Sequence, residues 1–241
     1  MRTAVPALIS ALPAACATAY AAPAAARFPA GRLVFPAITR VPSESRAIAL
    51  TFDDGPDEGL EHFLELLEET GARATFFVVG EQVERAPGRL EEIISRGHEV
   101  GVHCYRHHNH LRLGPRRVIE DMRRAGERVE GVSGRPTQLF RPPYGVFNLA
   151  SWIEAERRGW ERVLWARWGR DWRRRATPGS IATEIGQPQA GDVLLLHDSD
   201  RYAAPGSWRN TLGALPVILE RLSSRGLKVL PVGELLERNG C

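Results

Sequence analysis

The chain has 241 residues, of which 43% are hydrophobic and 25% are charged, and its formal net charge at pH 7 is only +3. This length and composition suffice for one large hydrophobic core or two smaller ones. The small net charge argues against a nucleic-acid partner, and no base-stacking aromatic pattern accompanies the arginines at 173–175. The three cysteines, one of them in the N-terminal segment, do not make a disulfide scaffold.

The N-terminus has the pattern of an export signal. Arg2 supplies a minimal positive region, and an apolar, alanine-rich stretch runs from about Ala4 to Ala22. Within it, Ala19-Tyr20-Ala21 has the small-x-small form of a cleavage site. Two prolines weaken a continuous membrane helix, but an uncleaved membrane tether remains an alternative. We therefore predict a signal peptide or anchor over residues 1–22, a lead-in segment over 23–45, and an exported protein that is secreted, periplasmic or attached to the cell surface.

From residue 46 to the end, strand-like and helix-like patterns alternate. Short apolar runs predict buried strands, and the segments between them have the apolar period of amphipathic helices. The expected strands cover residues 47–50, 74–79, 98–102, 139–140, 162–166, 192–196 and 228–232, and the expected helices 60–69, 81–96, 116–130, 151–158, 181–187 and 212–224. Such alternation without a linker favours one α/β barrel, with parallel strands covered by helices, over an open sheet. We therefore treat residues 46–241 as one domain.

Two adjacent carboxylates, Asp53 and Asp54, follow the first strand. Neighbouring carboxylates repel, and burial at a strand end removes part of their hydration. Such a pair is kept at low cost only if a cation or a shared proton relieves the repulsion. A turn is the simpler alternative, because Asp-Gly-Pro, completed here by Gly55 and Pro56, is a common way to leave a strand.

His103 and His107 follow the third strand and lie four residues apart. On a helical turn, two imidazoles at this spacing face the same side and can converge on one ion. With one carboxylate they form the set of two histidines and one acid that is found at catalytic zinc sites. A solvated histidine-rich loop is the alternative, since His108 and His110 lie close by. The acidic pair at another strand end favours the metal site.

Further polar residues stand at the ends of expected strands. Arg141 and His197 come directly after apolar runs, and Asp171 follows one by a few residues. In a parallel barrel, the carboxyl ends of the strands share one face, and active sites form there. We therefore expect these three residues to converge with Asp53 and His103 in one site.

Five motifs thus occur in a fixed order along the chain. They are Thr-Phe-Asp-Asp-Gly-Pro from Thr51, His-x-x-x-His from His103, Arg-Pro-Pro-Tyr-Gly from Arg141, Asp-Trp from Asp171, and Leu-Leu-His ending at His197. This set, within about residues 47–236, resembles the polysaccharide deacetylases, the NodB-homology enzymes of carbohydrate esterase family 4. The resemblance implies a distorted (β/α) barrel with about seven parallel strands. It also implies metal-dependent hydrolysis of acetyl groups on a sugar polymer.

The resemblance assigns the metal ligands and the base. It implies that Asp54, His103 and His107 hold one divalent ion, which we expect to be zinc, with cobalt or another divalent ion as the alternative. Asp53 would be the general base, and Arg141 would orient it and keep it ionised. This division fits the chemistry, since a metal acidifies a bound water that a nearby carboxylate can deprotonate. An ordinary salt bridge is the alternative role for Arg141.

The resemblance also assigns the acid and the residues that contact the substrate. His197 would protonate the leaving amine, and Asp171 belongs to the same catalytic set. The Tyr144 backbone N–H would stabilise the oxyanion, and Trp172 and Leu195 would line the acetyl pocket. Each has a structural alternative: a satisfied histidine at a strand end for His197, turn packing for Tyr144, and core packing for Trp172 and Leu195.

Two positions depart from the family pattern. Cys104 follows the first metal-binding histidine, where serine or threonine is usual, and a thiol is a weaker hydrogen-bond partner. Trp168 stands where the fourth motif usually has an acid that helps to tune the catalytic histidine. Asp171 and Asp198 are both candidates to replace this acid. Trp168 could instead reshape the sugar-binding cleft.

The sequence therefore predicts a metal-dependent deacetylase of N-acetylated amino sugars, such as those of peptidoglycan or chitin-like oligomers. A catalytically silent carbohydrate-binding module on the same fold is one alternative, and a related hydrolase of linear or cyclic amides is another. Asp53, Arg141 and His197 argue against the silent module, because binding alone needs neither a base nor an acid. A glycosidase is disfavoured, since its two carboxyl groups must flank a bond at about 5 Å or more.

Overall fold

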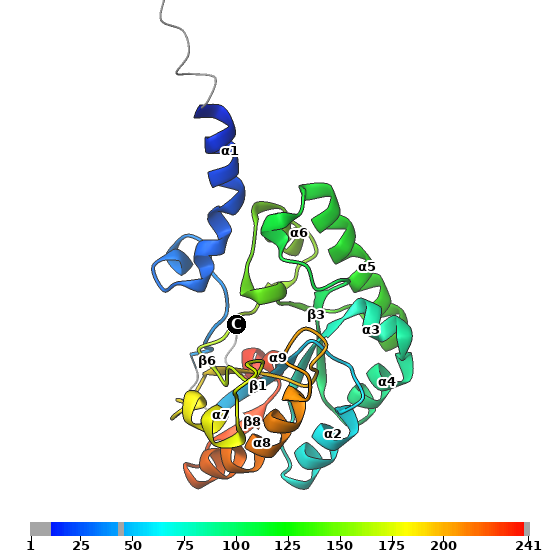
Figure 1. Ribbon diagram of the computed structural model, residues 1–241, viewed down its shortest axis with the longest axis vertical. Helices are drawn as coiled ribbons and strands as arrows, with labels where there is room; N and C mark the ends of the chain where they lie inside the picture. Colours follow the sequence, from blue (N-terminus) through cyan, green and yellow to red (C-terminus); the bar gives the residue numbers. More distant parts are fainter. Residues whose placement is uncertain (1–10, 43–45, 239–241) are drawn as a thin grey trace, which may run out of the picture.

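The computed structural model describes residues 11–42 and 46–238. Its centre is one curled sheet with the strand order β5-β4-β3-β2-β1-β7-β6, and β8 pairs with β1 (Figure 1). Every strand pair in this sheet is parallel. The strands are β1 (Ala47–Asp53), β2 (Thr75–Val79), β3 (Glu99–Cys104), β4 (Leu139–Phe140), β5 (Glu161–Arg162), β6 (Arg167–Trp168), β7 (Val193–His197) and β8 (Lys228–Leu230). This architecture confirms the predicted distorted α/β barrel of about seven parallel strands.

The described helices are α1 (Ala11–Ala21), α2 (Leu60–Glu69), α3 (Gly80–Arg85), α4 (Pro87–Ser95), α5 (Pro115–Ser133), α6 (Leu149–Arg157), α7 (Pro178–Ile185), α8 (Ser207–Ser224) and α9 (Val232–Glu237). Most of them cover the outer face of the sheet (Figure 1), but α1 extends away from it and α9 packs against the opposite face. Four short 3-10 helices join them: η1 (Ala22–Arg27), η2 (Gly31–Leu33), η3 (His110–Arg112) and η4 (Pro143–Gly145).

Most differences from the expected elements have a local cause. The helix expected over 81–96 is two helices, because Pro87 has no N–H to continue the first and instead starts the second. Thr177 caps α7 by accepting the Ser180 N–H, so this helix begins before the expected position at residue 181. The strand expected over 162–166 is two short strands, β5 and β6, which form the two ends of the sheet.

The alternation of side chains along β1 decides to which face of the sheet Asp53 points. Leu50 and Phe52 belong to the hydrophobic cluster beneath the helices, whereas Ala47 and Ala49 belong to a second cluster on the opposite face of the sheet. Because successive side chains of a strand point to opposite faces, Asp53 shares the face of the two alanines. The base predicted from the sequence therefore points into the curled sheet, away from the helix layer.

The lead-in segment closes part of the gap between the two ends of the sheet. Ile38 forms a parallel bridge with Val163, and Arg40 forms an antiparallel bridge with Asp192. The Ile38 N–H donates to the Arg162 carbonyl at 2.7 Å. This part of the lead-in thus packs as an additional extended segment of the barrel.

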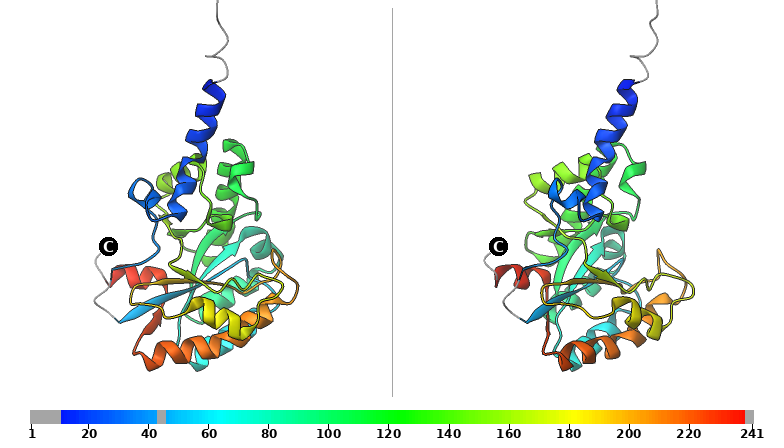
Figure 2. Two further views of the ribbon diagram at one scale, coloured as in Figure 1. Left: turned by 60° about the vertical axis from the view of Figure 1, so that its left-hand side comes forward. Right: turned by 90° about the vertical axis from the view of Figure 1, so that its left-hand side faces the viewer.

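The N-terminal helix α1 extends away from the sheet in each view (Figure 2). At its end, the Tyr20 hydroxyl donates to the Leu113 carbonyl at 2.8 Å and accepts from Asn148 Nδ2 at 2.6 Å. Within the described residues, no helix combines the length and the apolarity needed to cross a membrane. Residues 1–10 of the expected leader or anchor lie outside the described part of the chain, and its role stays a prediction.

One buried histidine links this fold to pH. His98 lies directly before β3, is 3% exposed, and accepts the Ala74 N–H at 3.2 Å through Nδ1. Burial, with the charges of Arg73 and Arg96, lowers the pKa of His98 from 6.5 to about 4. Below pH 6.5 the unfolded chain binds a proton that the folded chain does not bind until about pH 4. The free energy of unfolding therefore falls across this window as the pH is lowered.

We expect His98→Asn to reduce this pH dependence, because the amide oxygen can accept the Ala74 N–H and the side chain does not titrate. The loss of unfolding free energy between pH 7 and pH 4 should be smaller in the variant by roughly 2 to 3 kcal/mol. Urea unfolding at both pH values measures the difference. Equal losses in the two proteins would contradict the assignment.

Candidate active site

The register of the parallel strands decides which polar residues meet. β1 and β7 pair Asp53 with His197, so the expected base and acid lie on neighbouring strand ends. β3 and β4 pair Val102 with Phe140, which brings the next residues along, His103 and Arg141, side by side. These are the carboxyl ends of the strands, where a parallel barrel places its active site.

One carboxylate and two imidazoles meet at the ends of β1 and β3. Asp54 Oδ1 lies 3.5 Å from His103 Nε2 and 3.3 Å from His107 Nε2, and one ligand atom of each residue lies within 4.8 Å of the others. Among the described residues, no hydrogen-bond donor reaches this buried oxygen. A buried carboxylate oxygen without a donor is costly unless a cation satisfies it. The three side chains therefore fit a divalent ion, and their atoms are the kind found at zinc sites.

The protonation states of this cluster suit a metal. His103 Nδ1 lies 2.7 Å from the Arg141 carbonyl oxygen, which can only accept, so Nδ1 carries a proton and Nε2 is the nitrogen available to a metal. Burial lowers the pKa of His107 to about 4 despite the nearby Asp54, so this imidazole is neutral near pH 7. Burial raises the pKa of Asp54, but the neighbouring imidazoles, including those of His103, His197 and His107, lower it more, to about 2.

Arg141 binds the carboxylate beside the cluster. Its guanidinium is fully buried and donates to Asp53 Oδ1 at 2.6 Å, to Thr51 Oγ1 at 2.8 Å and to the Leu164 carbonyl at 3.0 Å. The other Asp53 oxygen, Oδ2, lies 4.0 Å from His103 Nε2. Asp53 is therefore held at one oxygen and presents the other toward the three-residue cluster. This geometry suits a base, although the role itself stays a prediction.

His197 has a carboxylate partner on the opposite side of the site. Its Nδ1–H donates to Asp171 Oδ1 at 2.9 Å and its backbone N–H donates to Asp171 Oδ2 at 2.7 Å. The Thr211 hydroxyl donates to the same Oδ2 at 2.8 Å. Burial lowers the pKa of His197, but the Asp171 carboxylate raises it more, to about 10. His197 therefore carries a proton near neutral pH, and its role as the acid stays a prediction.

The structure separates the two acids that the sequence left as candidates for tuning His197. Asp198 accepts the Gly55 N–H at 3.1 Å through Oδ1. Burial also raises the pKa of the Asp198 carboxyl well above its ordinary value. Asp171 is the one that makes the hydrogen bonds to His197. Of the two candidates, only Asp171 thus contacts His197, and its role in tuning that histidine stays a prediction.

The three residues expected to contact substrate lie around this centre. The Tyr144 ring packs edge-on against His107 with centroids 4.6 Å apart, and the Tyr144 backbone is left-handed, with a φ of 61°. The Trp172 ring lies 5.6 Å from the His197 ring. Leu195 is buried on β7, two residues before His197, and so points to the same face of the sheet. Their roles as oxyanion donor and pocket walls stay predictions.

The two departures from the family pattern have different consequences. Cys104 is a buried free thiol, and burial raises its pKa well above the ordinary value, so it stays protonated and unreactive. Trp168 stands at the position of the usual acid but cannot supply its charge, and it packs against other indoles instead. Its ring lies 5.6 Å from that of Trp165 and 4.9 Å from that of Trp172.

Sequence reasoning missed two residues that support the site. The Tyr202 ring stacks on His107 with centroids 4.4 Å apart, and its hydroxyl donates to Glu81 at 3.0 Å. Thr211, on α8, supports Asp171. No short motif marks either residue, and the only available signal was their position after the strand that ends in His197. Of the histidines in the loop that could have been solvated as a whole, His108 is exposed, whereas His107 lies in the three-residue cluster.

Comparisons with known proteins show the family of this chain. Residues 40–163 match the family described as polysaccharide deacetylase. The chain is 36% identical over 200 residues to a peptidoglycan-N-acetylglucosamine deacetylase of Bacillus cereus, covering 81% of this chain and 91% of the relative. It is 29% identical over 203 residues to a chitooligosaccharide deacetylase of a Bradyrhizobium species, covering 80% and 92% of the two chains.

Solved structures show the same likeness. A family 4 carbohydrate esterase from Streptomyces lividans, solved in complex with acetate, superposes with a TM-score of 0.69 at 30% identity, covering 76% of this chain and 91% of that one. The chain therefore belongs to the polysaccharide deacetylase family, as its ordered motifs predicted.

Proposed function

We propose that this protein is an exported, zinc-dependent deacetylase that hydrolyses the N-acetyl groups of amino sugars in a bacterial cell-wall polysaccharide. The observation that carries the proposal is the placement of Asp53, held by Arg141, between the Asp54–His103–His107 cluster and His197. The relatives named for peptidoglycan N-acetylglucosamine and for chitooligosaccharides support an amino-sugar substrate.

The chain's own residues account for the proton transfers. A zinc ion held by the Asp54 cluster would polarise the acetyl carbonyl and acidify the attacking water. Asp53 takes a proton from that water while the water oxygen bonds to the acetyl carbon. Protonated His197 gives a proton to the amine nitrogen as the carbon–nitrogen bond breaks, which leaves acetate and a free amino sugar. The Tyr144 N–H would stabilise the negative oxygen that forms in between.

A silent binding module is less consistent with these contacts. The buried Asp53–Arg141 pair and the His197–Asp171 pair both remove charges from water. Sugar binding needs neither pair, whereas hydrolysis of an amide needs a base and an acid. The contacts therefore favour the enzyme.

The substrate is tested by acetate release. The purified, zinc-loaded protein would be incubated with peptidoglycan, chitooligosaccharides and acetylated xylan, and acetate would be measured over time. We expect release from the first two, which carry N-acetyl groups. Release from acetylated xylan alone would contradict an amide substrate, and release from none would contradict the proposed function.

Asp171→Asn tests the acid. The amide keeps a hydrogen bond to His197 but removes the negative charge that raises the His197 pKa to about 10. Because His197 must be protonated to act, the alkaline limb of the pH–kcat profile should move to lower pH, by one unit or more, and kcat should fall about 10- to 100-fold. An unshifted alkaline limb would show that His197 is not the acid whose ionisation limits the reaction.

We further propose that residues 1–22 direct export and stay attached to a catalytic domain over 46–241. The Tyr20 hydrogen bonds to Leu113 and Asn148 support retention, because cleavage after Ala21 would remove them. Intact-mass measurement on protein recovered from the producing cells and from their medium tests this. A mature chain that begins at Ala22 would contradict retention.

A further inference from the structure

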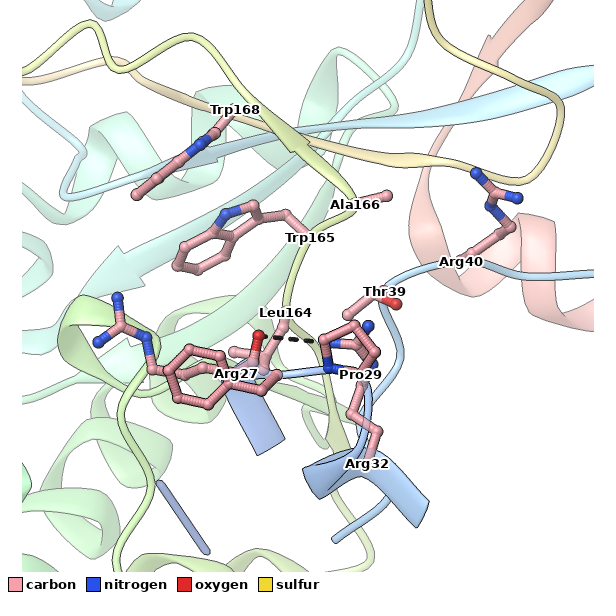
Figure 3. A pocket seen from close by; sticks show the side chains of 10 residues that line it. Arg27, Pro29, Arg32, Thr39, Arg40, Leu164, Trp165, Ala166 and Trp168 are labelled. Atoms are coloured by element: carbon pink, nitrogen blue, oxygen red, sulfur yellow. Dashed lines mark hydrogen bonds between the residues drawn. The ribbon is translucent and has the colours of Figure 1, made fainter. Parts of the chain in front are cut away.

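A pocket of about 660 Å³ lies beside the site just described and does not include its metal-binding cluster. Figure 3 shows its two sides. Trp165, from the connection between β5 and β6, and Trp168, on β6, lie on one side. Arg27 and Arg32, from the lead-in segment, lie on the other. The volume is within the range of pockets that hold small ligands and is sufficient for a disaccharide.

A row of indole rings joins this pocket to the proposed acid. The Trp172 ring lies 5.6 Å from the His197 ring, the Trp168 ring lies 4.9 Å from that of Trp172, and the Trp165 ring lies 5.6 Å from that of Trp168. All three indoles are only partly buried. We call them the tryptophan row. The Arg170 guanidinium lies over the Trp168 ring at 4.9 Å, so an arginine side chain, rather than the core, covers part of the row. Partly exposed aromatic rings can pack against the C–H faces of sugar rings, and an extended glycan could follow them away from His197.

The pocket also has an excess of positive charge. Arg27, Arg32 and Arg40 line it. In the described part of the chain, no carboxylate lies within ion-pair distance of Arg27 or Arg32, and Arg40 shares the buried Asp192 with Arg167. Arg32 Nη1 donates to the Ala26 and Arg27 carbonyls at 3.3 and 3.4 Å, but these neutral partners do not balance its charge. A neutral glycan would leave Arg27 and Arg32 without a carboxylate partner. Carboxylates are the natural match, because the planar guanidinium can donate two parallel hydrogen bonds to them.

We propose that this pocket is a subsite for a carboxylate-bearing sugar, or for a carboxylate substituent on it, within the same glycan strand whose acetyl group lies at the metal site. The inference rests on the proposed function. The tryptophan row supports the sugar rings, and Arg27 and Arg32 bind the carboxylate. Trp168, which stands where the family usually has an acid, thus serves substrate recognition, and the enzyme prefers acidic cell-wall glycan over neutral chitin-like oligomers.

The test is a binding measurement in the zinc-loaded Asp53→Asn protein, in which slow turnover leaves the ligand intact. Calorimetry would compare a tetrasaccharide of alternating N-acetylglucosamine and N-acetylmuramic acid with neutral chitotetraose. The Arg27→Gln/Arg32→Gln double variant should bind the acidic tetrasaccharide about five- to tenfold more weakly and chitotetraose unchanged. Trp168→Ala should weaken both about tenfold. Arg116→Gln, which removes an exposed charge on α5, is the matched control and should change neither.

Three outcomes would overturn the subsite. They are equal losses for the two glycans in the double variant, no loss for either, or an equal loss in Arg116→Gln. Binding to vesicles that contain anionic lipid is measured as well, because the apolar residues Phe28 and Leu33 are exposed in the same segment as the two arginines. Vesicle binding that needs Arg27 and Arg32, with unchanged glycan affinity, would assign the charges to a membrane instead. None of these readouts uses acetate release, so failure of the deacetylase proposal is seen separately.

Discussion

Replacing Asp53 with asparagine is expected to lower kcat about 10²- to 10⁴-fold while zinc binding is retained. The amide cannot accept the proton of the attacking water, but Asp54, His103 and His107 are unchanged. Steady-state acetate release and zinc content, measured on the same preparation, test the two halves of this expectation. Wild-type turnover in Asp53→Asn would show that another group is the base.

The same substitution has a structural consequence that must be measured beside the kinetics. Arg141 is fully buried, and loss of the Asp53 charge leaves its guanidinium with neutral partners only. Removing one member of a buried ion pair costs about 3 to 5 kcal/mol. We therefore expect Asp53→Asn to unfold at a lower denaturant concentration. Turnover should be compared only at temperatures where circular dichroism shows that the variant is folded.

Replacing His103 with alanine is expected to abolish both zinc binding and activity. Removal of a group that only supports a ligand already weakens metal affinity about 10- to 100-fold, and loss of a ligand itself should exceed this. His108→Ala is the matched control, since His108 is an exposed histidine of the same segment. Zinc titration followed by acetate release should separate the two variants. Equal zinc affinity in His103→Ala and the wild type would remove His103 from the metal site.

The sequence predicted the overall fold because each element carried its own signal. The Leu60–Glu69 helix has a clear apolar stripe, and the structure has the same bounds. The connection between β5 and β6 was predicted less well, since its apolar residues suggested one strand, whereas the sheet ends there. The role of the lead-in was also missed, because pairing of Ile38 with Val163 depends on contacts between distant parts of the chain.

The part of the site that could be predicted from the sequence consists of the residues at strand ends. The convergence of Asp53, His103, Arg141 and His197 follows from the shared face of a parallel sheet. The choice between Asp171 and Asp198 could not be made, because it depends on which carboxylate reaches the His197 ring. Hydrogen bonds of the folded chain decide it.

The proposed reaction depends most on the metal. Protein stripped with a chelator should release no acetate from peptidoglycan, and stoichiometric zinc or cobalt should restore release, with one ion bound per chain through Asp54, His103 and His107. Metal analysis and acetate release on the same stripped and reloaded sample give the result. Loss and recovery together would support the mechanism, whereas full activity in thoroughly metal-free protein would contradict it.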